Sequence, residues 1–134
     1  TESDAQKIDT LRIPNPINNS LLPNVNAKIS DLTGLESMSN LVYLDASDNE
    51  LTAVNTANNP NLKNLGLGLN LLTTLDVSNN SNLKQLFAYN NNLHLLVTVA
   101  SVRSTFQKIL QYSKAQKMAF ETLIPLLVLK KSTS

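Results

Sequence analysis

Apolar side chains recur in the middle of this chain with a period of 21 residues. Three successive segments, beginning at Asn40, Asn61 and Asn82, share the pattern N-L-x-x-L-x-(A/L)-x-x-N-x-L-x-x-(V/L). Because side chains alternate between the two faces of a strand, the spacing of two between the central apolar positions predicts one short, half-buried strand in each copy. We expect these strands near residues 43–47, 64–68 and 85–89.

The segments that join the predicted strands are short and rich in Asn, Ser and Thr. A period of 21 residues leaves little room for a helix, so extended or single-turn returns are expected. Ile29 and Leu32 match Leu51 and Val54 and indicate the tail of a preceding, degenerate repeat. Before them, prolines and asparagines favour turns. Residues 1–28 are therefore predicted to form an irregular lead-in, whose apolar side chains cover the open end of the array: Ile13, Ile17, Leu21, Leu22 and Val25.

The period fails after Leu96, because the positions that would continue it are Ser104, Gln107 and Tyr112. Apolar residues follow a helical stripe there instead, and Ser104 and Gln107 are spaced as in a capping box. We predict one helix near residues 102–119, while residues 126–129 fit a strand or a helix tail and 130–134 should fray. The domains are thus a lead-in (1–28), a repeat array (29–97) and a C-terminal helical cap (98–134). A truncated or shifted reading frame is the alternative origin of the last segment.

The array resembles the internalin-like leucine-rich repeats of bacterial surface and secreted proteins, in their 21-residue subclass. The resemblance covers residues 29–97 and rests on the period and on two runs, Leu44-Asp-Ala-Ser-Asp-Asn-Glu-Leu51 and Leu75-Asp-Val-Ser-Asn-Asn-Ser-Asn-Leu-Lys-Gln-Leu86. It implies an α/β-class solenoid with a short curved parallel β-sheet and little convex helix, here with an irregular N-terminal cap and a C-terminal α-helix. It also implies recognition of a protein or glycan partner, most often outside the cell.

Side chains between the inward apolar positions face outward on the concave sheet. Alignment of the repeats places them in three rows: Tyr43/Asn64/Gln85, Asp45/Gly66/Phe87 and Ser47/Gly68/Tyr89. Exposed aromatic rings beside a glycine trough suit a planar or extended ligand. We therefore predict a binding site composed of Tyr43, Asp45, Ser47, Asn64, Gln85, Phe87 and Tyr89. In the alternative interpretation, Phe87 and Tyr89 lie across the glycines and cover backbone.

The repeated asparagines at the predicted corners have a structural interpretation. Asn49, Asn70 and Asn91 follow each strand at the same position of the repeat. Each turn leaves backbone N–H and C=O groups without a strand partner, and an inward amide can satisfy both kinds. We expect these three residues to form a structural ladder, with no part in binding.

The sequence offers no catalytic or metal-binding constellation, and we predict a non-enzyme without a cofactor or metal. There is no cysteine, which excludes disulfides and thiolate metal sites, and His94 is the single histidine. Asp45, Asp48 and Glu50 could hold calcium loosely, but a solvated acidic rim is the preferred interpretation. No Ser/His/Asp arrangement, phosphate loop or paired carboxylates at catalytic spacing can be assembled.

The net charge of +1 is unevenly distributed. Residues 1–60 hold eight acids and three bases, and residues 61–134 hold two acids and eight bases. Nucleic-acid binding by the basic end is not favoured, because interleaved aromatics are missing there; its bases are Arg103, Lys108, Lys114, Lys117, Lys130 and Lys131. No apolar run is long enough to span a bilayer. The chain begins at Thr1, so we expect a processed or partial form: a monomeric, extracellular or surface binding module, or alternatively a cytoplasmic regulatory repeat protein.

Overall fold

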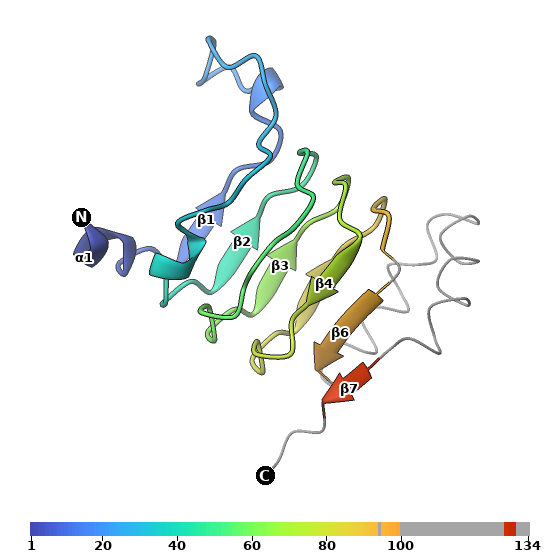
Figure 1. The fold of residues 1–134 in the computed structure, drawn as a ribbon. Helices are drawn as coiled ribbons and strands as arrows, with labels where there is room; N and C mark the ends of the chain where they lie inside the picture. Colours follow the sequence, from blue (N-terminus) through green and yellow to red (C-terminus); the bar gives the residue numbers. More distant parts are fainter. Residues whose placement is uncertain (94, 100–127, 131–134) are drawn as a thin grey trace.

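The computed structural model describes residues 1–93, 95–99 and 128–130 (Figure 1). Most of the elements are short, as expected for coils of about 21 residues. In chain order they are α1 (Glu2–Ala5), β1 (Thr10–Arg12), η1 (Pro16–Asn18), η2 (Leu35–Ser37), β2 (Tyr43–Asp45), β3 (Asn64–Gly66), β4 (Thr74–Asp76), β5 (Gln85–Phe87), β6 (Leu95–Val99) and β7 (Val128–Lys130). The 3₁₀ turns η1 and η2 and the helix α1 are the helical elements of the described residues.

Two parallel sheets form the two faces of a solenoid. One has the order β1-β2-β3-β5 and the other β4-β6-β7. In the first sheet Tyr43 pairs with Asn64, which pairs with Gln85, so the 21-residue period of the sequence becomes the register of the strands. The ladder continues past the strand ends, since Ala46 N–H donates to Gly66 O at 2.9 Å. The predicted strands and extended returns are therefore present.

The core consists of the inward positions of the repeat, stacked coil upon coil. Leu44, Leu65 and Leu86 are completely buried, one in the middle of each strand. Burying a leucine side chain contributes about 1.5–3 kcal/mol, so these stacks supply the main stabilisation of the array. The remaining buried apolar residues are Leu35, Leu41, Ala46, Leu51, Leu62, Leu67, Leu72, Leu75, Val77, Leu83 and Ala88.

The prediction of an irregular lead-in is wrong at β1, which adds a fourth strand to the concave sheet. Leu11 pairs with Leu44 and Arg12 with Asp45 in parallel register. The sequence pattern does not reveal this repeat, because Ile29 lies eighteen positions after Leu11, whereas the matching Leu51 lies seven positions after Leu44. An insertion of eleven residues therefore interrupts the first coil and shifts its two halves out of period.

Residues 14–28, here called the corner loop, extend away from the sheet beyond the end of β1 (Figure 1). Its apolar side chains do not cover the open end as predicted: Leu21 is 85% exposed, and Ile17 and Leu22 are also exposed. Of the residues predicted to cover that end, Ile13 does pack against the core, together with Ile8 and Leu11, which were not predicted to do so. The loop is tied to the array by Asp48, which accepts hydrogen bonds from Asn15 (2.8 Å) and Lys28 (2.6 Å), residues at its two ends.

The end of the chain contributes a strand to the second sheet. β7 pairs in parallel with β6, Val97 opposite Val128, so the segment that fitted either a strand or a helix tail is a strand at residues 128–130. The helix predicted near 102–119 and the fraying predicted for 131–134 lie outside the described residues. Among the described residues, no helix is long and apolar enough to cross a membrane.

Candidate binding site on the concave sheet

Corner asparagines hold the concave strands at a fixed spacing. Asn70 accepts a hydrogen bond from Leu51 N–H at 3.0 Å and donates to Ala46 O at 3.0 Å and Leu67 O at 3.1 Å. Each amide thus bonds to its own coil and to the preceding one. Asn49 and Asn91 make the equivalent bonds to their coils, with Ile29 N–H and Leu72 N–H as donors.

The residue before each corner asparagine has a left-handed backbone. The φ angles are 54° at Asp48, 58° at Leu69 and 51° at Asn90. Asp and Asn tolerate this conformation, but a bulky aliphatic side chain does so only with strain. Leu69 is therefore the unusual member of the series, and its side chain is also exposed.

A second asparagine ladder, which the sequence reasoning missed, lies within the returning segments. Asn80 donates to Thr56 O (2.9 Å) and Asn59 O (2.8 Å) and accepts from Thr56 Oγ1 (2.7 Å). Asn59 donates to Leu35 O, but its Oδ1 has no partner among the described residues, because Leu35 stands where the next coil has Thr56. The sequence feature that could have revealed this ladder is the spacing of 21 residues between Asn59 and Asn80, but the asparagine occurs at this repeat position in only two coils.

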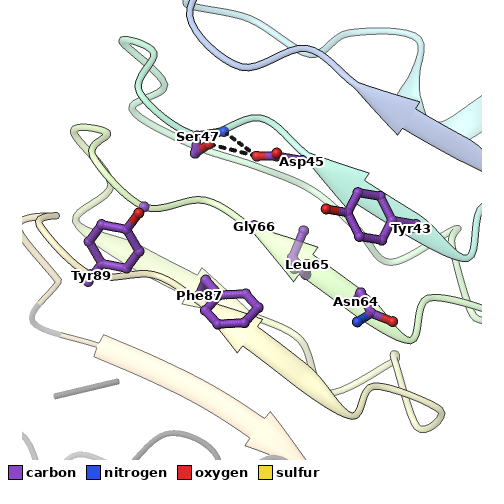
Figure 2. Close-up of a pocket in the computed structure, with 9 residues that line it drawn as sticks. Tyr43, Asp45, Ser47, Asn64, Leu65, Gly66, Phe87 and Tyr89 are labelled. Atoms are coloured by element: carbon purple, nitrogen blue, oxygen red, sulfur yellow. Dashed lines mark hydrogen bonds between the residues drawn. The ribbon is translucent and has the colours of Figure 1, made fainter. Parts of the chain in front are cut away.

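The concave sheet contains a hollow of about 170 Å³ between β2 and β5, floored by β3 (Figure 2). Six of the seven predicted binding residues line this hollow, and three further residues of β3 and the positions after it form its floor. The lining residues are Tyr43, Asp45, Ser47, Asn64, Leu65, Gly66, Gly68, Phe87 and Tyr89. The seventh predicted residue, Gln85, lies next to this hollow, where its amide oxygen accepts a hydrogen bond from Asn64 Nδ2.

The two aromatic side chains of the third coil behave differently. A Cβ added to Gly68 would lie 2.6 Å from Tyr89 Cζ, so the tyrosine ring lies across this buried glycine. A Cβ on Gly66 would instead meet Asp45 Oδ1 at 3.2 Å. Phe87 leaves 39% of its surface exposed at the rim of the hollow. The covering interpretation therefore describes Tyr89, whereas Phe87 presents an open ring (Figure 2).

The charged groups of the face come from β1 and β2. Asp45 Oδ1 accepts hydrogen bonds from Ser47 Oγ (2.6 Å) and Ser47 N–H (3.2 Å), which fixes the carboxylate. Arg12 Nη2 lies 3.9 Å from Asp45 Oδ2, and its guanidinium lies 5.9 Å from the centroid of the Tyr43 ring. Arg12 is thus a member of the face that the sequence reasoning missed, because β1 itself was hidden.

No group of three or more His, Cys, Asp or Glu side chains that could hold a metal ion occurs within the part of the chain that the structure describes. The three acids considered for calcium do not converge. Asp45 bonds to Ser47, Asp48 bonds to the ends of the corner loop, and Glu50 is exposed. Hydrogen bonds from Lys28 and then Asn15 hold the pKa of the Asp48 carboxyl below its usual value. His94 and the bases between residues 100 and 127 lie outside the described residues.

The sequence matches no protein-family model and no curated protein. Among solved structures, the functional domain of InlJ from Listeria monocytogenes is similar with a TM-score of 0.58 and 23% identity, over 98% of this chain and 22% of that one. An internalin, inlF, from the same species is similar with a TM-score of 0.56 and 25% identity, over 81% of this chain and 28% of that one. The chain therefore spans less than a third of the length of either structure.

One feature named for the InlJ structure does not occur in this chain. The InlJ structure is described as including a cysteine ladder, whereas this chain has no cysteine and stacks asparagines. The likeness to these two structures, together with the parallel sheets of this chain, fits a leucine-rich-repeat solenoid. The chain therefore has an internalin-like leucine-rich-repeat fold.

Proposed function

We propose that this chain is a non-catalytic recognition module that holds a protein partner, or else a glycan, against its concave sheet. The observation that carries the proposal is the open ring of Phe87 beside a hollow floored by Gly66. An aromatic side chain left exposed on a rigid strand, next to a concave surface, is the usual composition of a binding anchor. The leucine-rich-repeat fold supports the same function.

The size of the face limits what it can hold. Four strands at about 4.8 Å spacing and five residues at about 3.3 Å give a sheet of roughly 300 Å², against about 800 Å² per partner in a standard interface. Covering the exposed part of Phe87 contributes on the order of 1 kcal/mol. The concave sheet therefore suits an extended segment of the partner, with further area supplied by the corner loop or by neighbouring coils.

The proposed location is outside a bacterial cell or on its surface, with a cytoplasmic regulatory protein as the alternative. Internalins among the similar solved structures support the first location. The coding sequence upstream of Thr1 separates the two: an export signal there supports a surface protein. A gene that starts directly in the repeat array without such a signal would favour the cytoplasmic alternative.

The test of the concave site is selection without a known partner. The full chain is immobilised and probed with a phage library of random dodecapeptides and with a glycan array. Selected ligands are then measured against Phe87→Ala and against Thr73→Ala, an exposed control residue outside the hollow. We expect Phe87→Ala to weaken binding by about fivefold or more, with no change for Thr73→Ala. Ligands that bind both variants equally would refute the concave site.

A further inference from the structure

A carboxylate faces the exposed aromatic ring across one glycine. Asp45, Gly66 and Phe87 are register partners on three adjacent strands. Two strand spacings separate Asp45 from Phe87, a distance of about 9.6 Å between their backbones. Gly66 has no side chain, and the Asp45 carboxylate reaches over it, since a Cβ at Gly66 would lie 3.2 Å from Asp45 Oδ1. The space that remains between this carboxylate and the Phe87 ring belongs to the hollow (Figure 2).

Half of the Asp45 carboxylate is left for a ligand. Its Oδ1 is held by Ser47, whereas Oδ2 accepts no hydrogen bond from any described residue. The nearest cation to Oδ2, Arg12, lies at 3.9 Å, beyond hydrogen-bond distance. The Asp45 side chain is 18% exposed, so its charge is only partly hydrated and is screened less than a surface charge.

The chain already places a guanidinium at one end of this arrangement. Arg12 lies over the Tyr43 ring at 5.9 Å and beside Asp45, while its side chain stays 66% exposed. Cations within about 6 Å of an aromatic ring centroid are attracted by the ring. The contact shows that this combination of ring and carboxylate suits a guanidinium, and Phe87 offers a second ring with no such cation among the described residues.

We infer that the hollow receives an arginine side chain from an extended partner segment, with its guanidinium between Asp45 Oδ2 and the Phe87 ring. This inference rests on the proposed function and specifies its ligand. A planar guanidinium can donate to the carboxylate and lie against a ring at the same time. A phenylalanine side chain would cover Asp45 without giving Oδ2 a donor, and burying an unpaired charge is costly. Tyrosine or tryptophan could donate one hydrogen bond but would leave the negative charge without a cation. An acidic side chain would be repelled.

Arg12 competes with the incoming arginine, because both approach Asp45. Removing its charge should therefore strengthen binding. An increase in affinity cannot result from partial unfolding, which would weaken binding. In addition, Arg12 is largely exposed and its substitution leaves the core intact.

The experiment uses two short peptides, acetyl-Gly-Ser-Arg-Ser-Gly-amide and the same peptide with citrulline, which has the shape of arginine without the charge. Each is titrated into the full chain at low salt and followed by the backbone resonances of Gly66 and Phe87. We expect saturable shifts for the arginine peptide and at least about tenfold weaker binding for the citrulline peptide. Equal affinity of the two peptides would overturn the inference.

Three variants complete the test. Asp45→Asn should lower the affinity for the arginine peptide about tenfold, whereas Glu50→Gln, which removes an exposed acid at the corner, should not. Arg12→Gln should raise the affinity. Unchanged binding in Asp45→Asn, or weaker binding in Arg12→Gln, would refute the inference. If library-selected ligands lack arginine yet depend on Phe87, the inference fails while the proposed function stands.

Discussion

Replacing Asn70 by alanine tests how the coils are held together. Its amide contacts three carbonyl oxygens, but each of them keeps another donor after the substitution. Ala46 O retains Asn49, Leu67 O retains Asn91, and Gly68 O retains the Asp48 N–H. The group that loses its sole partner is Leu51 N–H, in a residue that is completely buried.

The cost follows from this inventory. An orphaned buried N–H costs about 1–3 kcal/mol. The Asn70 amide has two N–H donors, shared among the three carbonyl oxygens, and losing them costs about 0.5–1.5 kcal/mol each. We expect Asn70→Ala to lower the free energy of unfolding by about 3 kcal/mol, a large share of the 5–15 kcal/mol that domains have. The control is Asn61→Ala, an exposed asparagine with one 3.2 Å bond to Ser39 O, which should change stability by less than about 0.5 kcal/mol.

The assay is urea unfolding of the full chain followed by circular dichroism, with the slope m compared between variants. An unchanged m shows that the same unfolding transition is measured in each case. A loss below 1 kcal/mol for Asn70→Ala, or equal losses for Asn70→Ala and Asn61→Ala, would show that the ladder does not hold the coils together as described.

Three further predictions concern the corners and the glycines. Leu69→Asn should raise the free energy of unfolding by about 1 kcal/mol, since it relieves the left-handed strain of a leucine that is 42% exposed and outside the buried core; a lower melting temperature would contradict this. Gly68→Ala should destabilise by about 1–2 kcal/mol, because its Cβ displaces the Tyr89 ring. In the same thermal scan Gly66→Ala should destabilise less, because its Cβ comes no closer than 3.2 Å to Asp45 Oδ1, at the end of a side chain that can shift. Because the pKa of Asp48 is lowered by Lys28 in the folded state, its stabilisation is present above the unfolded pKa of about 3.9 and is lost below it. Below about pH 4 the wild type should therefore lose stability more steeply than Asp48→Asn, and parallel curves of melting temperature against pH would refute this.

The regular part of the fold could be predicted because the number of residues between equivalent leucines is also the number of residues between paired positions on neighbouring strands. A period of 21 places Asn64 between Tyr43 and Gln85 without any knowledge of coordinates. The rows of the concave face follow from that register, and so do most of the residues that line the hollow.

The rest depends on information that a period does not contain. β1 was missed because the corner loop separates Leu11 from Ile29, and with β1 the sequence reasoning also missed Arg12. The alternation of side chains along a strand predicts that Tyr89 and Phe87 share one face of the sheet. It does not predict the orientation of each ring, and so it does not predict that Tyr89 covers Gly68. Apolar residues of the corner loop were assigned to a cap because hydrophobicity alone does not say where a turn points.

The hydrogen bonds of Asp48 to both ends of the corner loop have a consequence for engineering. Asn15 and Lys28 are fastened to one carboxylate, and the coils that follow keep their register despite the eleven additional residues. In a solenoid each coil contacts only its neighbours, so a change at one corner does not travel far. Foreign loops of different length could therefore be grafted between these two anchors, which would make the chain a cysteine-free display scaffold whose grafted loop lies beside an unaltered concave sheet.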